Sequence, residues 1–315
     1  MIDACPLGPA RILLITGRID RHARELIKAF GNVGAEVHTA GLAEIGFDTG
    51  SASGLAIPHF GGSLPDAVCV RTMDAGSFEQ VTRRLGVLHA LTRLAVLVSN
   101  DARAIENCVD KSMTSFLLAR AGLPSPRSYA VESRTEAARI LAGEDGPMVL
   151  KPLFGAQGKG LKLLGTADDL PAAEEIAGGV YYLQRFAGVE TAGRWSDVRI
   201  LVSAGRAVAS MRRQAASWIT NVKQGAEPLP MPPEGDLEAL AVAATEAVGG
   251  DFCGVDLLRD AAGRAQIIEV NSMPAWTGLK KATGCDLAAI RARDLLARVE
   301  SRRAAGASRP LSAAE

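Results

Sequence analysis

Two acidic residues and an asparagine on a predicted hairpin, residues 252–271, form a pattern that could bind a metal ion. A turn near Asp260 sets Asp256 directly opposite Glu269, and Asn271, two residues further on, faces the same side. Hard oxygen ligands of this kind suit Mg²⁺ or Mn²⁺, and carboxylates this close repel each other unless a cation lies between them. The alternative is a solvated face with two acids by chance, which the apolar residues between them disfavour. The hairpin therefore predicts a magnesium site.

A glycine-rich loop, residues 155–160, lies between the strand patterns 147–151 and 160–164. Glycines allow backbone N–H groups to approach phosphate oxygens closely. The loop is not a Walker A motif, because GxxxxGK[ST] is absent and no helix follows it; a kinase glycine-rich lid is closer in mechanics. Lys151 at the strand end and Lys111 after Asp110 add two cations that could neutralise phosphate. Each feature alone also fits an ordinary hairpin loop or a surface lysine.

A second predicted hairpin, residues 197–214, carries an acid and several arginines. Asp197 and Arg199 share a face, and a turn near Ser203 places Arg212 opposite Asp197, whereas a one-residue slip places Arg213 there. The guanidinium fork suits a carboxylate or a phosphate. An exposed Asp–Arg pair worth under about 1 kcal/mol is the plain alternative. The polar segment that follows, 217–225, fits a substrate-lining loop and a surface turn equally well.

The elements that must position these residues fall into two kinds. In the first third of the chain, strands alternate with helices, which is typical of a small parallel α/β domain. Its first turn, Thr16-Gly17-Arg18-Ile19, is not GxGxxG, so a dinucleotide site there has little support. We expect strands at 11–16, 35–39, 67–73 and 94–98 and helices at 19–31 and 77–92.

The rest of the chain alternates hairpins with helices and fits two α+β lobes facing each other. A helix over 110–121 begins at a capping Asp110 and ends before Gly122. Further expected elements are a strand at 181–186 and helices at 236–248 and 286–303. The predicted domains are an α/β domain at 1–105, a small lobe with the glycine flap at 106–180, a C-terminal lobe with the metal site at 181–303, and a flexible tail at 304–315.

Composition excludes several classes of protein. The 315 residues carry 35 basic and 35 acidic side chains and only 4% aromatics, which disfavours a nucleic-acid partner. The five cysteines form no CxxC pair and the four histidines no HxxxH pair, so a reducing compartment is favoured over a disulfide framework or a zinc site. No apolar run approaches membrane-spanning length, and no signal peptide is evident. We therefore expect a cytoplasmic protein without a membrane or nucleic-acid partner.

These pieces, in this order over residues 94–290, resemble the ATP-grasp superfamily and most of all its RimK-type branch, which joins glutamate or a similar amino acid to a carboxylate acceptor. The ordered set is more specific than any single motif. The segment 218–221 looks more like the branch that modifies amino-group carrier proteins in lysine synthesis. The motifs that carry the resemblance are Asp110-Lys111, Lys151, the glycine loop, Gln184, Asp197-x-Arg199, Asn221, Gly254-Val255-Asp256 and Glu269-Val270-Asn271-Ser272.

The resemblance implies a role for each matching residue. Lys151 and Arg199 would be catalytic, Lys151 on the ATP phosphates and Arg199 on the acyl-phosphate. Asp256, Glu269 and Asn271 would hold the metal. ATP would be bound by Lys111, Lys151, Gly155, Gln157, Gly158 and Gly160, with Leu183 and Gln184 at the adenine edge and Glu190 as a candidate for the ribose. The substrates would meet Asn221 and Arg213, which the family register prefers to Arg212.

The resemblance also implies a reaction. An acceptor carboxylate takes the γ-phosphoryl group of ATP, and the amine of an amino acid then displaces phosphate from the acyl-phosphate to form an amide. We expect L-glutamate as the amine and a small carboxylate such as a pterin-type cofactor precursor as the acceptor, since the neutral chain does not favour a strongly basic ribosomal target. A glutamate ligase for a protein terminus, a kinase-like phosphotransferase and a non-catalytic nucleotide-binding regulator are the alternatives. A homo-oligomer is compatible with the sequence.

Overall fold

The computed structural model describes residues 8–155 and 157–307 of the chain. These residues form two compact units, one of residues 8–102 with 286–307 and one of the described residues within 103–285. The expected tail, 304–315, is helical over its first four residues, and the remainder lies outside the described residues. No helix in this described part of the chain combines the length and the apolar character that crossing a bilayer requires.

The first unit is the predicted parallel α/β domain. Its four strands are all parallel, because each connection between them returns the chain to the end of the sheet at which the previous strand began. The sheet order is β2 (Glu36–Ala40), β1 (Arg11–Ile15), β5 (Ala67–Val70), β6 (Leu97–Ser99), with helices α1 (Arg21–Asn32) and α2 (Phe78–Arg93) and a small ribbon of β3 (Gly46–Phe47) and β4 (Leu55–Ala56).

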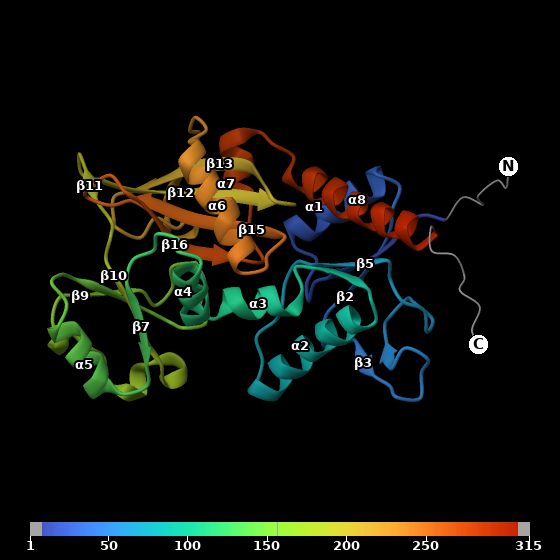
Figure 1. Cartoon of the computed structure of the whole chain (residues 1–315), viewed down its shortest axis with the longest axis horizontal. Helices are drawn as coiled ribbons and strands as arrows, with labels where there is room; N and C mark the ends of the chain where they lie inside the picture. Colours follow the sequence, from blue (N-terminus) through green and yellow to red (C-terminus); the bar gives the residue numbers. More distant parts are fainter. Residues whose placement is uncertain (1–7, 156, 308–315) are drawn as a thin grey trace. The chain divides into compact units, whose positions relative to one another are not determined.

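The last helix, α8 (Leu287–Ala307), belongs to this first unit and not to the C-terminal lobe in which we expected it (Figure 1). It packs against α1, and its Arg291 donates a hydrogen bond to Ser99 at the end of β6. The sequence pattern predicts that the helix buries one face, but not which surface covers that face. The fully or almost fully buried residues of this face are Leu287, Ala288, Ala292, Leu295 and Val299.

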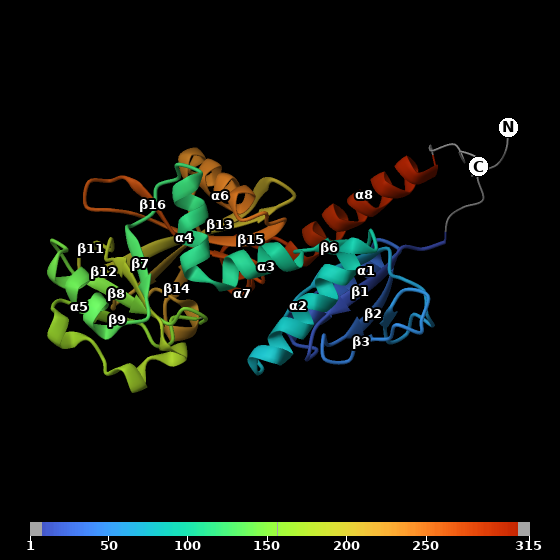
Figure 2. The ribbon, with the colours of Figure 1, turned by 60° about the horizontal axis from the view of Figure 1, so that its bottom comes forward.

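The second unit contains a small antiparallel sheet with helix α5 (Arg134–Ala142) on one face (Figure 2). Strand β10 lies inside this sheet, so the expected lobe boundary at 180/181 falls one strand too early. Alternation along the strands buries Leu150 and Leu183 under α5 and turns Lys151 and Gln184 to the opposite face. The sheet order is β7 (Ser128–Val131), β10 (Tyr181–Arg185), β8 (Met148–Lys151), β9 (Lys162–Leu164).

A larger antiparallel sheet completes the second unit. Helix α6 (Gly235–Ala247) covers the face that carries Val198, Ile200 and Val255, so the alternate residues Asp197 and Asp256 point to the other face. The sheet order is β14 (Glu227–Leu229), β13 (Arg206–Ala215), β12 (Arg194–Ser203), β15 (Phe252–Arg259), β16 (Ala265–Asn271), with β11 (Glu190–Thr191) beside β12. The remaining helices are α3 (Ala102–Val109), α4 (Lys111–Arg120) and α7 (Thr277–Thr283).

Two irregularities set the register of the functional strands. Between β15 and β16, Asp256 pairs with Glu269 as predicted, with a register shift directly after this pair. Between β12 and β13, a shift at Leu201/Val202 places Arg213 opposite Asp197. Arg212, the partner predicted from a regular turn, is exposed instead, because the extra residue moves it to the other face.

Candidate active site

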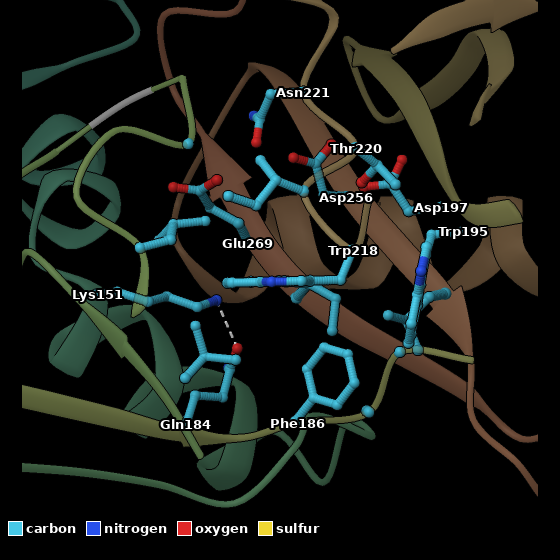
Figure 3. Close-up of a pocket in the computed structure, with 18 of the residues that line it drawn as sticks. Lys151, Gln184, Phe186, Trp195, Asp197, Trp218, Thr220, Asn221, Asp256 and Glu269 are labelled. Carbon is cyan, nitrogen blue, oxygen red and sulfur yellow. Dashed lines mark hydrogen bonds between the residues drawn. The ribbon is translucent and has the colours of Figure 1, made fainter. Parts of the chain in front are cut away.

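A cavity of about 120 Å³ in the second unit brings most of the predicted site residues together (Figure 3). The small sheet contributes Lys151 and Gln184, and the large sheet contributes Asp256 and Glu269. The glycine loop and the segment 218–221 supply further walls. The predicted residues that line the cavity are Lys111, Lys151, Gly155, Gln157, Gly158, Gln184, Arg213, Asn221, Asp256 and Glu269.

Six predicted residues are not part of the cavity lining. Glu190 and Arg212 are exposed on their strands, and Leu183 lies in the core under α5. A Cβ on Gly160 would come within 2.9 Å of Pro152, so this glycine permits the bend of the loop. Arg199 and Asn271 lie behind the lining, beside Asp256 and Gly254 respectively.

Asp256 is the centre of a buried network of charges. Arg199 binds it with two nitrogens, and the Nη2–Oδ2 distance is 2.7 Å; Nη2 of Arg213 lies 3.1 Å from the same Oδ2. Arg213 also pairs with Asp197, whose Oδ2 accepts a hydrogen bond of 2.7 Å from Thr220. Burial pushes the pKa of Asp256 upward, but the two guanidinium groups more than offset this and hold it below its usual value. Burial dominates at Asp197 and raises the pKa of that carboxyl, despite Arg213.

The residues predicted to hold a metal fit a hard divalent cation. Asp256 and Glu269 lie on directly paired positions and face one cavity, and the side-chain amide nitrogen of Asn271 is 3.4 Å from the carbonyl oxygen of Gly254, a contact that does not use the amide oxygen. Within the described residues no three His, Cys, Asp or Glu side chains gather into a metal-binding group. Two carboxylates and an amide suit an ion that keeps water and phosphate ligands.

Two lysines lie close to this acidic pair. Nζ of Lys111 lies 3.7 Å from Glu269 and donates hydrogen bonds of 3.3 and 3.0 Å to the carbonyls of Leu153 and Gly155, at the base of the glycine loop. Lys151 is almost fully buried and donates a hydrogen bond of 2.6 Å to Oε1 of Gln184. Burial lowers the pKa of Lys151 to about 8, while Glu269 opposes the shift.

The glycine loop closes over the cavity. Its tip contacts the segment after β13: Nε2 of Gln224 is 3.3 Å from the carbonyl oxygen of Gln157, and a Cβ on Gly158 would lie 2.4 Å from Oδ1 of Asn221. Gly158 and Gly160 have φ of +71° and +73°, which favours glycine. The loop therefore combines a conformation and a close approach that only glycine accommodates without strain.

Three aromatic rings form one wall of the cavity, which the sequence interpretation missed as a group. The ring centroid of Phe186 lies 5.6 Å from the ring centroid of Trp195 and 5.8 Å from that of Trp218. Trp218 projects into the space beside Lys151 (Figure 3). The alternation of side chains along a strand could have revealed these rings. Phe186 follows Gln184 by two residues and Trp195 precedes Asp197 by two, so each ring is expected on the same face as a predicted site residue. Residues 218–221 of the segment 217–225 thus line the cavity, whereas 217 and 222–225 are exposed.

Comparison with known proteins adds relatives of stated activity. A family model described as a RimK-like ATP-grasp domain matches residues 108–295. The chain is 33% identical over 251 residues to a tetrahydromethanopterin:alpha-L-glutamate ligase of Methanosarcina acetivorans, covering 70% of this chain and 76% of the relative. A probable alpha-L-glutamate ligase of Alkalilimnicola ehrlichii is 33% identical over 231 residues, covering 67% and 74%.

Solved structures show the same fold. The ATP-grasp ligase PsnB in complex with a minimal precursor superposes with a TM-score of 0.70 at 21% identity, covering 93% of this chain and all of that one. A RimK domain ATP-grasp protein from Sphaerobacter thermophilus gives a TM-score of 0.67 at 19% identity, covering 90% and 98%. Each likeness extends over both units of the chain, beyond the segment that the family model matches.

Proposed function

The chain belongs to the RimK-like ATP-grasp family, and we propose that it uses ATP to join the amino group of L-glutamate to a carboxylate of a small pterin-type cofactor precursor. The ATP-grasp fold and the family predicted from motif order are confirmed. The protein is thus an ATP-dependent carboxylate–amine ligase. The observation that carries the proposal is the cavity in which the paired carboxylates, both lysines and the glycine loop meet.

The relatives support glutamate as the amine and a pterin as the acceptor. The methanogen relatives, from Methanosarcina acetivorans and Methanococcus maripaludis, act on tetrahydromethanopterin and are 33% and 32% identical to this chain. The aromatic wall of the cavity is compatible with a planar heteroaromatic ring. Both agree with the acceptor class that the neutral charge of the chain favours.

The residues of the cavity suit phosphoryl transfer followed by amide formation. We assign the ATP phosphates to Lys111 and Lys151, since both ammonium groups border the acidic pair. A magnesium ion held by Asp256, Glu269 and Asn271 would neutralise charge on the transferred phosphoryl group. The closed glycine loop excludes water, which would otherwise hydrolyse the acyl-phosphate before the amine attacks.

We assign the arginines different roles: Arg213 binds a substrate, and Arg199 positions Asp256. Arg213 lines the cavity, so we assign it a substrate carboxylate, together with Asn221 across the glycine loop. Arg199 lies outside the lining with its guanidinium on Asp256, so we propose that it acts on the acyl-phosphate through the placement of that carboxylate. Arg212 is exposed and has no place in this scheme.

We place the reaction in the cytoplasm. ATP and glutamate are both supplied there, and a scattered set of five cysteines without a CxxC pair suits a reducing compartment.

Mass spectrometry of a complete reaction tests the proposal. The purified protein is incubated with ATP, Mg²⁺, L-glutamate and a panel of reduced pterin carboxylates, and the expected product is a pterin heavier by one or more glutamyl residues, with one ADP formed per amide. A stable phosphorylated pterin without amide would instead indicate a phosphotransferase. Glutamylation of added carboxyl-terminal peptides only would indicate a protein acceptor, and neither product nor ADP would indicate a non-catalytic protein.

A further inference from the structure

We propose that Tyr182 and Ser115 are positioning residues for Lys151, acting through Gln184, and that the side chain of Gln184 orients this lysine instead of reading the adenine. The inference rests on the proposed nucleotide site, since it concerns the lysine assigned to the ATP phosphates. It adds the side chains of Tyr182 and Ser115 to the machinery of that site and gives Gln184 a different role. Neither the metal site nor the glycine loop contains any of them.

A continuous chain of polar side chains leads from helix α4 to the cavity. The Ser115 Oγ and Tyr182 Oη atoms are 2.7 Å apart, and Nε2 of Gln184 lies 3.4 Å from the same Tyr182 oxygen. The other end of the Gln184 amide, Oε1, accepts the hydrogen bond of 2.6 Å from Nζ of Lys151 (Figure 3). Four residues from three elements, α4, β10 and β8, thus form one network.

Burial makes each hydrogen bond of this network costly to lose. Tyr182 and Gln184 are each 2% exposed, so an unpaired hydroxyl or amide there would carry a desolvation cost. Because the amide nitrogen can only donate, the Tyr182 hydroxyl accepts from it and shares its remaining hydrogen-bonding capacity with Ser115 and Ser128. This arrangement leaves the amide oxygen facing Lys151. The Lys151 ammonium group can only donate and so requires the amide oxygen, and the Tyr182 hydroxyl on the amide nitrogen supports this same orientation.

The network also connects the elements that carry Lys111 and Lys151, the two lysines assigned to the ATP phosphates. Lys111 begins α4 and Ser115 follows one turn later, so both lie on the same side of the helix. The Ser115–Tyr182 contact fixes this side of α4 to strand β10, while Lys151 stands on the neighbouring strand β8. A substitution of Tyr182 should thus weaken the binding of the nucleotide phosphates although Tyr182 does not contact the nucleotide.

The preceding residue, Tyr181, provides a matched control. It is 1% exposed and lies on the same strand, but it faces the α5 side, where its hydroxyl donates a hydrogen bond of 3.3 Å to the carbonyl of Pro171. Tyr181→Phe and Tyr182→Phe each remove one buried hydroxyl from adjacent positions. A purely structural role of the Tyr182 hydroxyl predicts similar effects of the two changes.

The test measures binding of Mg²⁺ with AMP-PNP, a non-hydrolysable ATP analogue, by calorimetry in the full chain. We expect Tyr182→Phe to weaken binding about fivefold, in line with the loss of one buried hydrogen bond, and Ser115→Ala to weaken it in the same direction. Tyr181→Phe should leave the affinity within about twofold, although its melting temperature falls comparably. In a Lys151→Ala background, Tyr182→Phe should have no further effect, because its route to the nucleotide is gone.

Each other outcome overturns a defined part of the argument. Equal losses in Tyr181→Phe and Tyr182→Phe, or a Tyr182→Phe loss that persists in the Lys151→Ala background, overturn the positioning role. Normal binding by Lys151→Ala also overturns it but leaves the proposed function in place. Failure of the unmodified chain to bind the nucleotide overturns both.

Discussion

Asp256 and Glu269 are paired across one hairpin, but their surroundings predict different consequences of substitution. Glu269 is partly exposed and has Lys111 at 3.7 Å, so Glu269→Gln should remove a metal ligand and leave the fold intact. We expect turnover to fall at least about 100-fold with little change in stability. ADP release at saturating Mg²⁺ and urea unfolding measure the two effects, and turnover near that of the unmodified chain would contradict the metal assignment.

Asp256→Asn is the instructive comparison at this pair. It leaves the buried Arg199 and Arg213 without their shared carboxylate, which should cost about 3–5 kcal/mol of stability besides activity. Loss of turnover in this variant alone therefore says little about the metal, and the Glu269 variant is the decisive one.

Lys151 predicts a pH dependence of nucleotide binding. Burial lowers its pKa to about 8, so in the free protein its charge is lost as the pH rises through this value. Because phosphate favours the ammonium form, affinity for Mg²⁺ with ADP should decline above about pH 8, by up to about tenfold per pH unit, with proton uptake on binding. Calorimetry in buffers of different ionisation enthalpy measures both. Lys151→Arg stays charged and should flatten the profile; an unchanged profile in that variant would assign the titration to another group.

At the scale of elements, we expect the glycine loop to couple ATP consumption to amide formation. Gly158 has a positive φ, and a Cβ there would meet Asn221, so Gly158→Ala should hold the loop away from the segment after β13. Water then reaches the acyl-phosphate, and the ratio of ADP formed to amide formed should rise well above one. Quantifying both products in one reaction gives this ratio.

Gly165→Ala is the control for this loop. Gly165 lies just after β9, φ is not in the left-handed region, and a Cβ would make only an ordinary contact of 3.6 Å with Asp169. It should keep one ADP per amide. A ratio near one in Gly158→Ala would show that closure does not depend on this glycine.

At the scale of the whole molecule, we expect a core substitution in the first unit to lower stability without changing nucleotide affinity, and one in the second unit to lower both. Leu295 of α8 is fully buried in the first unit, and every residue that lines the cavity belongs to 103–285. Leu295→Ala should therefore cost about 2–5 kcal/mol of stability and leave nucleotide affinity unchanged. The matched change Leu183→Ala, under α5 beside Gln184, should reduce both. Urea unfolding and calorimetry decide this, and a loss of affinity in Leu295→Ala would show that the site depends on the first unit.

Residue type and local alternation were enough to predict a large part of the site. The pairing of Asp256 with Glu269, the two lysines and the glycine loop all follow from the residues near each of them, and the four-stranded parallel sheet follows from alternating strands and helices. The strand pairing and the parallel sheet are confirmed, because strand periodicity decides which side chains share a face, while the roles of the site residues stay predictions. The order of the motifs then identified the family.

Only the tertiary structure decided which partner each face meets. A bulge at Leu201/Val202 places Arg213 opposite Asp197, as the family register indicated and a regular turn did not, because one extra residue moves every later side chain of the strand to the other face. Packing against α1 assigns α8 to the first unit, and the approach of β10 to β8 pairs Gln184 with Lys151. Local sequence determines which face is buried or polar, but long-range packing selects what lies opposite, and no pattern along the chain encodes that choice.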